Sequence, residues 1–554
     1  MTDTHASRRT LAPVLFALSF APFAHAQTAP PPGTVLKQTA PPPALPTAPT
    51  NVLSLPAPEQ QQGQSSTPIP VARIDIEGNA LLPASALAPM VQSLQGRTVT
   101  LGDLQQAAQR IAALYRAQGY PLANAFIPAQ TIKDGVVRIQ VVEPTYDRIA
   151  VQGSRLAPAQ AKRTLGVSAG QPIAQAPLDR GLLLLNRTPG VRVAGTLIPG
   201  AQPGTSTLKV DLSDGPLVHT RLHADNYGSE YTGRTRGGVD VSIDNPFGHG
   251  AQAAVTTLTS AGGLLHAGGF SLTSPDLHNG LRAGAYGSRT LYRLGGAFAA
   301  LEQSGRVNQI GLDASYPLVL EPGRLLSVRV DALRNGFVQR SVTVGTTSRS
   351  HVREARISVD GALADTHGVT SGGLSVSHGT LSMDSPDALV SDTAGANARG
   401  GFWLASLQVQ RDQPLPREWQ LQLNLSAQMA SHSLDGSEKF YLGGSYGVMS
   451  APIDADGGEA GALLGANLSH AIARPFGGEL RGALLLQDGK VWQRPTATSG
   501  AISSDLAGAG LGMDYQWKQT LSVHLAYVHG VGSNRTSSGA RVGGQWWIGF
   551  NADL

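Results

Sequence analysis

Residues 443–447 read Gly-Gly-Ser-Tyr-Gly, which matches the G-x-S-x-G pattern of hydrolases with a serine nucleophile. That chemistry requires a strand, a sharp turn and a helix around the serine, with an acid and a histidine later in the chain. Here Pro452 and a loop rich in Gly and Asp follow Ser445, and they do not predict a helix. Because short matches are common in a chain with 66 glycines, we expect no catalytic residue in this segment.

Two further sets of residues have side chains that bind metals. Asp454, Asp456 and Glu459 lie close together in the sequence, but the ligand spacing of a calcium loop is absent, so we expect a solvated loop. The 14 His residues show no metal-ligand spacing either. We therefore expect neither a metal site nor a cofactor, and we interpret the chain as a non-enzyme.

The composition points to a β-rich exported protein. Charged residues make up only 14% of the chain, and abundant Gly is typical of a fold with many turns. The absence of Cys suits an oxidising compartment in which the fold needs no disulfides. The Lys and Arg residues are dispersed and the net charge is only +4, so no nucleic-acid partner is expected.

The first 26 residues have the features of a signal peptide. Arg8 and Arg9 precede an apolar stretch over 11–23, and Ala24-His25-Ala26 provides small residues around a cleavage point. A membrane-spanning helix is the alternative, but the stretch is too short and Pro22 interrupts it. Residues 27–70 hold a third of the 36 prolines and predict an extended, Pro-rich linker.

Two α+β modules follow the linker. Residues 71–144 have the order strand, helix, helix, strand, strand, and residues 145–216 repeat this order in weaker form. Each module would offer an exposed sheet edge to which an extended chain could add a strand. The expected elements are strands at 71–79, 123–129, 136–142, 147–153, 191–199 and 206–212, and helices at 84–94, 101–118, 159–165 and 178–186.

Residues 217–554 alternate apolar and polar side chains, which is the pattern of membrane-spanning strands. A soluble sandwich also alternates, but this region is longer than a usual sandwich. We therefore predict a transmembrane antiparallel β-barrel of about 16 strands, with about 21 residues for each strand and its connection. The expected last strands span 462–472, 480–492, 507–517, 520–530 and 541–554. In the terminal strand, the lipid-facing side chains include Trp546, Ile548, Phe550 and Leu554, while Trp547 and Asn551 fall on the opposite, lumen-facing side. We also expect Trp546, Trp547 and Phe550 in an interfacial aromatic girdle.

Several short motifs in the same order resemble one family. They are Ile76-Glu77-Gly78-Asn79, Gly119-Tyr120, Ile127-Pro128-Ala129-Gln130, Asp134-Gly135-Val136-Val137, Thr188-Pro189-Gly190-Val191, Asp225-Asn226-Tyr227-Gly228 and Phe440-Tyr441-Leu442-Gly443-Gly444. On these residues the chain resembles the TpsB transporters of two-partner secretion, the ShlB/FhaC/HecB family, over about 69–554. The resemblance implies that the two modules are periplasmic POTRA domains and that the barrel lies in the outer membrane.

The resemblance also implies a mechanism and partners. The POTRA domains would capture an unfolded exoprotein of the TpsA type, haemolysin- or adhesin-like, and the barrel would secrete it (haemolysin secretion/activation). Outer-membrane lipid, periplasmic chaperones and the barrel-assembly machinery are further expected partners. The expected capture strand is 123–129; Phe126 is equally well interpreted as core. The expected capture residues are Ala125, Phe126, Ile127, Pro128 and Gln130.

The chain departs from the family in the long sixth extracellular loop. Relatives carry an Arg at the loop tip that pairs with an Asp on the inner barrel wall; here the corresponding residues are Met449, after Val448, and Gln487, two residues before Gly489. Both halves of the ion pair are therefore expected to be missing, so that Gly443, Gly444 and their neighbours are anchored by apolar and neutral contacts, or more loosely. The Pro-rich linker shows no obvious helix for the plug that some relatives insert in the pore.

Two alternatives remain open at this point. An outer-membrane insertase or assembly factor shares the architecture, although two modules after a Pro-rich linker favour secretion. A passive diffusion porin leaves the modules unexplained.

Overall fold

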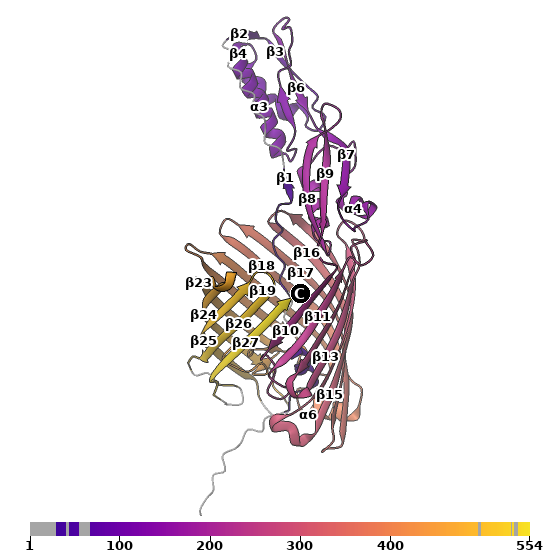
Figure 1. The fold of residues 1–554 in the computed structure, drawn as a ribbon, viewed down its shortest axis with the longest axis vertical. Helices are drawn as coiled ribbons and strands as arrows, with labels where there is room; N and C mark the ends of the chain where they lie inside the picture. Colours follow the sequence, from indigo (N-terminus) through magenta and orange to yellow (C-terminus); the bar gives the residue numbers. More distant parts are fainter. Residues whose placement is uncertain (1–28, 40–43, 55–66, 497–499, 533–534, 537–540) are drawn as a thin grey trace, which may run out of the picture.

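The computed structural model describes residues 29–39, 44–54, 67–496, 500–532, 535–536 and 541–554. The expected signal peptide, 1–26, lies outside them. An arm of two α+β modules stands on one end of a closed barrel (Figure 1). Among the described residues, no helix is both long and apolar enough to cross a membrane.

The first module has the expected elements in the expected order. Helix α3 begins at a capping box between Thr100 and Asp103, and it buries Leu104, Ile111 and Tyr115 against the sheet. The sheet order is β3-β6-β5, with β5 at one edge. A second small sheet, β2-β4, was not expected from the sequence. The elements are β2 Pro68–Val71, β3 Arg73–Glu77, α2 Ala84–Val91, a 3-10 turn Gln92–Leu94, β4 Arg97–Thr100, α3 Leu101–Ala117, β5 Asn124–Phe126 and β6 Val136–Val142.

The second module repeats this plan and rests on the barrel. Helix α5 buries Leu182 and Leu185 in the module core, while Leu183 and Leu184 pack against Leu320 at the barrel rim. The sheet order is β1-β8-β9-β7, in which β1 Leu53–Ser54 comes from the Pro-rich linker. The other elements are β7 Thr145–Gln152, α4 Pro158–Leu165, α5 Gln175–Asn186, β8 Val191–Pro199 and β9 Thr205–Asp214.

The described part of residues 217–554 contains 16 antiparallel strands that close into a barrel through pairing of β10 with β27. The strands are β10 Val218–Asp225, β11 Arg236–Asp244, β12 Gln252–Ser260, β13 Leu265–Thr273, β14 Arg282–Arg293, β15 Gln303–Glu321, β16 Arg324–Ser341, β17 Thr346–Asp365, β18 Gly368–Met383, β19 Gly400–Pro414, β20 Trp419–Ala430, β23 Ala460–Ala473, β24 Glu479–Gln493, β25 Ile502–Trp517, β26 Leu521–Gly530 and β27 Gly544–Asp553. Helix α6 Pro386–Ala394 lies in a connection at the end away from the arm (Figure 1). The expected fold class is confirmed.

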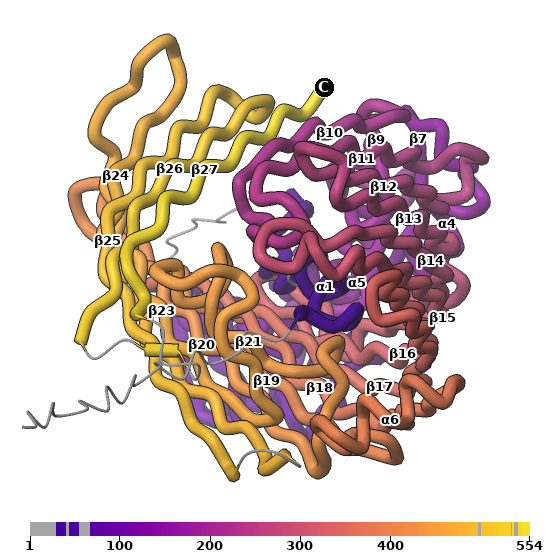
Figure 2. Tube along the Cα trace, turned by 90° about the horizontal axis from the view of Figure 1, so that it is seen from below, coloured from indigo at the N-terminus to yellow at the C-terminus, as the bar shows by residue number. Residues whose placement is uncertain are grey.

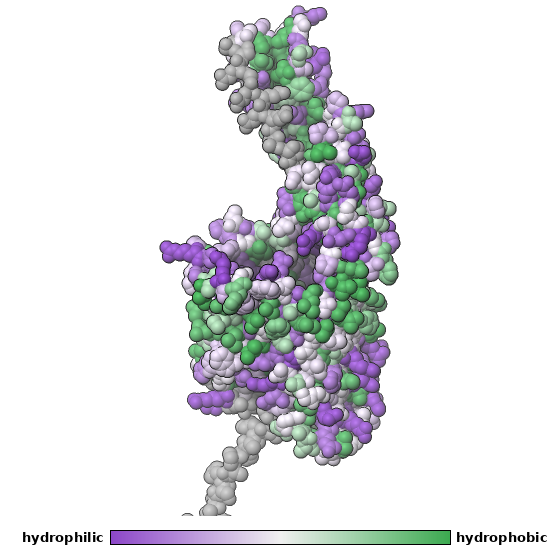
Figure 3. Space-filling model, in the orientation of Figure 1, coloured by the Kyte–Doolittle hydropathy of each residue, from purple (hydrophilic) through white to green (hydrophobic). Residues whose placement is uncertain are grey.

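The outward side chains of the strands form an apolar belt around the barrel (Figure 3). In β27 the expected facing is correct: Trp546, Ile548 and Phe550 are 57%, 50% and 40% exposed on the outside, and Leu554 follows the strand exposed. The expectation that Trp547 belongs to the interfacial aromatic girdle is wrong. This side chain is 3% exposed and points into the lumen, because neighbouring residues of a strand face opposite sides of the sheet.

The Pro-rich segment does not run extended throughout. Residues Pro32–Thr39 form helix α1, which lies inside the barrel (Figure 2). Val35 and Leu36 pack there in one cluster with wall residues such as Tyr292 and Phe337. The expectation that this region offers no plug helix is therefore wrong: Pro32 occupies the first helical turn, where its missing N–H costs nothing, and the next seven residues are free of proline.

Candidate functional site in the barrel lumen

The loop between β20 and β23, residues 431–459, folds back into the lumen (Figure 2). Its short strands β21 Phe440–Tyr441 and β22 Gly457–Gly458 pair with each other. Leu442, Val448 and Ala451 are fully buried against Val491 and Leu506 of the inner wall. The loop is therefore a packed element of the lumen.

This packing corrects the expectation that the acidic residues of the loop are solvated. The Asp454 carboxylate accepts a hydrogen bond from Ser229 at 2.7 Å, and that of Asp456 accepts one from Ser504. Glu459 forms an ion pair with Lys439 at 3.2 Å and is 3% exposed. Among the described residues, no group of three or more His, Asp or Glu side chains is placed to hold a metal ion.

Residues 443–447 form a tight turn rather than a strand–turn–helix. Gly444 N donates to Ala451 O at 3.1 Å, Gly447 N donates to Gly444 O at 3.1 Å, and Val448 N donates to Leu442 O at 2.6 Å. These bonds close the turn on itself, so Ser445 lacks the helix that a nucleophile elbow requires.

The loop tip is held to the wall by neutral contacts. The backbone N–H of Met449 donates to Gln487 Oε1 at 3.3 Å, and its carbonyl accepts from Trp547 Nε1 at 2.6 Å. Ser450 Oγ donates to Ala507 O at 3.3 Å. The Met449 side chain packs in an apolar pocket of Ala483, Leu485, Ala526, Val528 and Trp547.

The structure thus brings together the two positions at which the chain departs from its relatives. Met449 and Gln487 are in direct contact, whereas Asp488 faces the outside of the barrel. Gly489, two residues after Gln487, lies on the same inner face next to Leu442. At this place the lumen holds an amide and a thioether and no ion pair.

The N-terminal end of α1 rests on the same loop. The Cα of Gly33 approaches the turn at 435–437 so closely that a Cβ would lie 2.2 Å from the Ser437 backbone nitrogen. The Thr34 hydroxyl shares a 2.7 Å hydrogen bond with the Tyr441 hydroxyl, which also donates to Gly436 O at 3.1 Å. Helix and loop therefore form one body within the lumen.

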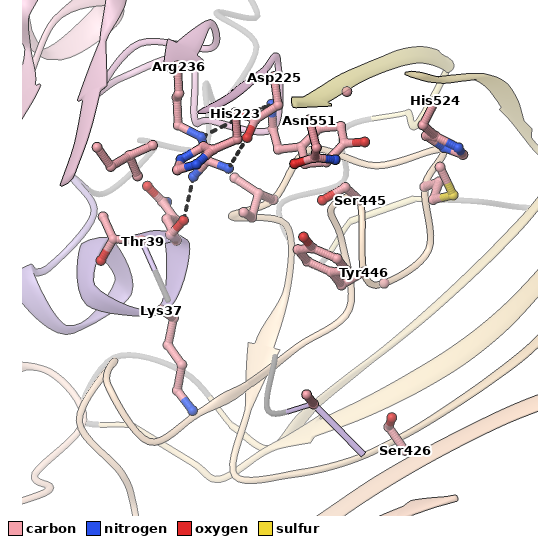
Figure 4. A pocket seen from close by; sticks show the side chains of 18 of the residues that line it. Lys37, Thr39, His223, Asp225, Arg236, Ser426, Ser445, Tyr446, His524 and Asn551 are labelled. Carbon is pink, nitrogen blue, oxygen red and sulfur yellow. Dashed lines mark hydrogen bonds and ion pairs between the residues drawn. The ribbon is translucent and has the colours of Figure 1, made fainter. Parts of the chain in front are cut away.

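The C-terminal end of α1 is held by an ion pair of the wall. Arg236 of β11 binds Asp225 of β10 through two bonds, at 2.8 and 3.1 Å, and both side chains are nearly buried. The remaining Arg236 nitrogen donates to Gln38 O at 2.6 Å (Figure 4). A cation at the carboxyl end of a helix complements the partial negative charge there.

Tyr227 joins this ion pair to the loop tip. Its backbone N–H donates to Asp225 Oδ1 at 2.8 Å, and its ring meets Trp547 edge-on, with centroids 5.7 Å apart. Tyr446 of the loop meets the same ring at 6.2 Å. Burial raises the pKa of the Tyr227 hydroxyl, which therefore stays protonated.

Two carboxyl groups of the loop are buried near α1. Burial raises the pKa of Asp435. Burial, followed by repulsion from the Glu354 carboxylate, raises the pKa of Glu438, and attraction to Lys37 of α1 and to Arg356 opposes this rise. The lumen retains a cavity of about 1160 Å³, which Lys37 helps to line (Figure 4).

The arrangement is that of a closed passage. Two segments of the chain, α1 and the loop, occupy the barrel interior, and hydrogen bonds, apolar packing and one ion pair hold them there. Such contacts are reversible without any bond chemistry.

The expected capture residues lie apart from the lumen, in the first module. Ala125 is buried, Phe126 is half-buried at the edge strand β5, and Ile127 packs against the module core. Pro128 follows the strand. The Gln130 side chain pairs with the backbone of Arg138 through two 2.8 Å bonds, so it continues the sheet beside β6.

The sequence did not reveal two important parts of the lumen, α1 and Arg236. For Trp547, the alternation of the last strand gave the correct inner face, and only its expected place in the aromatic girdle is wrong. The run of seven residues without proline after Pro32 was the available signal for α1.

Comparisons with known proteins agree with this architecture. The family model "Haemolysin secretion/activation protein ShlB/FhaC/HecB" matches residues 204–515, and the model "POTRA domain, ShlB-type" matches residues 69–144. The heme/hemopexin transporter protein HuxB of Haemophilus influenzae (strain 86-028NP) is 23% identical over 485 residues, which cover 85% of each chain. The hemolysin transporter protein ShlB of Serratia marcescens is 25% identical over 185 residues, covering 33% of this chain and 32% of its own. The solved structure of CdiB from Escherichia coli has the same fold, with a TM-score of 0.74 at 17% identity over 90% of this chain and 93% of its own.

Proposed function

Because the chain belongs to the haemolysin secretion/activation protein ShlB/FhaC/HecB family, we propose that it captures its exoprotein at the edge of the first POTRA domain and passes it through the lumen when α1 and the loop leave. The protein is an outer-membrane transporter of two-partner secretion, with its POTRA domains in the periplasm and a secreted exoprotein as its substrate. The insertase alternative has weaker support, because the matching family model is that of a secretion protein.

One observation carries the proposal: the arm stands at the periplasmic mouth of a closed barrel whose interior contains α1 and the loop 431–459 (Figures 1 and 2). A substrate bound to the arm lies beside the entrance. The barrel interior would offer a route that avoids lipid, because the ladder between its strands is closed.

The β5 edge supplies the proposed capture site. An extended substrate segment would add a strand beside Asn124–Phe126, with the half-buried Phe126 as an apolar contact. Gln130 limits this site to the β5 side, because its amide already fills the neighbouring stretch of β6.

Two further partners are part of the same proposal. Periplasmic chaperones keep the exoprotein unfolded before capture, and the barrel-assembly machinery inserts this barrel into the membrane. We propose that transport proceeds without a catalytic step, a nucleotide or a metal.

Deletion of residues 71–144 tests the capture step. Because the barrel strands close without the arm, we expect a heat-modifiable barrel in the membrane but no exoprotein in the medium. Phe126→Asp in the full chain is the point variant, with Arg110→Asp, an exposed change on α3, as its control. Secretion that persists after the deletion would contradict capture by the first POTRA domain.

A further inference from the structure

Seven arginines, which we call the arginine patch, lie on the outer surface of one wall of the barrel. They are Arg289 and Arg293 of β14, Arg306 of β15, Arg334 and Arg340 of β16, and Arg349 and Arg353 of β17, all exposed. These four strands stand side by side, and the arginines lie in the half of each strand that is away from the arm (Figure 2).

The facing of the patch follows from the alternation along each strand. Every arginine of the patch is an odd number of positions from a side chain of its own strand that packs in the lumen. These lumen-facing side chains are Tyr292, Val307, Phe337 and Val352. Because neighbours along a strand face opposite sides of the sheet, all seven arginines point away from the lumen.

The pairing of the strands concentrates positive charge on this outer face. Arg334 is directly opposite Arg353. Val338 is opposite both Arg306 and Arg349, so that two more arginines flank it on either side. Side chains directly opposite each other in a sheet are in contact range, and like charges at such positions destabilise the pairing of the strands.

No carboxylate within the described residues forms an ion pair with the arginine patch. Arg289 Nε donates to the neutral amide of Asn308 at 2.8 Å. The Asp384 carboxylate, just after β18, is paired with His351 at 2.8 Å, and Glu354 of β17 faces the lumen. The positive charge of the patch is therefore left unbalanced by the described residues.

The patch borders the apolar belt of the barrel. Ile310 is opposite Arg334 and is 62% exposed, and Leu312, Val330 and Ile357 continue the apolar surface toward the arm. Figure 3 shows the belt giving way to hydrophilic side chains at the end of the barrel away from the arm. Arginine on the outside of a membrane barrel costs least near the interface, where the lipid head groups lie.

We propose that the arginine patch binds lipopolysaccharide, the phosphorylated glycolipid of the outer leaflet. The guanidinium fork matches the geometry of a phosphate group, and the apolar surface next to the patch receives the acyl chains of the same lipid. A phosphate between Arg334 and Arg353 also relieves the repulsion between these side chains. The proposal needs only the outer-membrane location of the barrel, so it does not depend on how the exoprotein is captured.

A variant with four neutral replacements tests the patch. The patch variant carries Arg306→Gln, Arg334→Gln, Arg349→Gln and Arg353→Gln. The control variant carries the same replacement at four exposed arginines of the arm, Arg97→Gln, Arg110→Gln, Arg116→Gln and Arg192→Gln. The probe is lipid A, the phosphorylated anchor of lipopolysaccharide, added to each full chain in detergent. The patch variant should bind it about tenfold or more weakly, because the loss of one charge-assisted hydrogen bond already corresponds to about this factor. The control should bind like the unmodified chain, and equal binding by the patch variant would overturn the proposal.

Thermal unfolding distinguishes lipid binding from a purely structural role. In detergent alone the patch variant should be at least as stable as the unmodified chain, because the repulsion between Arg334 and Arg353 is absent. Lipid A should raise the Tm of the unmodified chain and of the control, and it should leave the Tm of the patch variant nearly unchanged. A patch variant that is less stable in detergent alone, yet is stabilised by lipid A as strongly as the unmodified chain, would show that the arginines only support the fold.

Other anions identify the source of the phosphate. Lipid A without its phosphates should not raise the Tm of the unmodified chain, and neither should inorganic phosphate, which lacks acyl chains. If phosphatidylglycerol stabilises the chain as well as lipid A does, the assignment to the outer-leaflet glycolipid is wrong. If the patch variant binds lipid A normally but secretes less exoprotein, the patch contacts the exoprotein and the proposal is wrong as well.

Discussion

The indole N–H of Trp547 donates a 2.6 Å hydrogen bond to the carbonyl of Met449, and this bond ties the last strand of the barrel to the tip of a loop 98 residues earlier. Both residues are buried. The Met449 backbone is thereby fixed on two sides, by Trp547 at its carbonyl and by Gln487 at its N–H. The position of the loop depends on this neutral clamp.

Met449→Arg should release the loop. The substitution buries a charge in an apolar pocket without a partner, which typically costs about 3–5 kcal/mol. Met449→Arg combined with Gln487→Asp should recover much of this loss, because the two positions touch. Membrane conductance and secretion of the exoprotein, measured for all four variants, give the coupling energy. Additive effects would mean that the two side chains do not meet.

Gly33→Ala should unseat α1. Alanine favours helix more than glycine does, so the substitution would stabilise an isolated helix by up to about 1 kcal/mol. In the lumen its Cβ would collide with the backbone of Ser437, and overpacking of this kind typically costs about 1–3 kcal/mol. We expect a higher channel conductance and sensitivity to large antibiotics. Gly102→Ala is the control, because the nearest atom to its Cβ would be 3.6 Å away. Equal conductance of the two variants would contradict the tight contact.

Phe550→Asp and Asn551→Asp should differ in the amount of assembled barrel, although the two residues are neighbours. Phe550 faces lipid, where a charge costs on the order of 2 kcal/mol. Asn551 lines the lumen cavity, where water solvates the new carboxylate. Heat-modifiable barrel on gels should fall for the first variant and stay normal for the second. A reversed order would show that the facing of β27 is inverted.

The seating of the loop should weaken as the pH rises. The docked loop raises the pKa of Glu438 above its ordinary value, so between these two values the docked state holds a proton that the released state has lost. Docking is therefore strongest below the ordinary pKa and is lost progressively as the pH rises through the raised one. Conductance should increase over this range.

Glu438→Gln should weaken the dependence of conductance on pH. Asp435→Asn should remove much of the dependence that remains, because burial raises the pKa of Asp435 as well. Glu418→Gln, in an exposed turn between strands, should keep the full slope. A conductance that falls with rising pH would contradict the direction of these shifts.

The helices and strands of the arm and the barrel were predictable because their apolar side chains recur at short, regular spacings along the sequence. Leu104, Ile111 and Tyr115 recur on one face of α3, and Ile548 and Phe550 alternate with polar residues, so sequence spacing alone fixes their facing. The last strands, expected at 480–492 and 520–530, lie at Glu479–Gln493 and Leu521–Gly530.

The contents of the lumen depend on contacts between distant residues. Gly33 contacts Ser437, Gln38 contacts Arg236, and Leu53 pairs with Gly195. No regular spacing in the sequence indicates any of these contacts. Helix α1 has eight residues, too short to be stable by itself, so the wall and the loop stabilise it. Because prolines flank these eight residues on both sides, the sequence predicted an extended linker and no helix.

The seat of α1 also fixes the order in which each molecule can assemble. Residues 32–39 leave the ribosome early, yet their partners Arg236 and Tyr441 come much later, and the tip of the loop that carries Tyr441 is bonded to residues that come later still, Gln487 and Trp547. The helix therefore cannot complete its seat until β27 has joined β10. A barrel that closes before α1 docks would be unsealed for that interval, and the rate at which α1 docks would set how long the interval lasts.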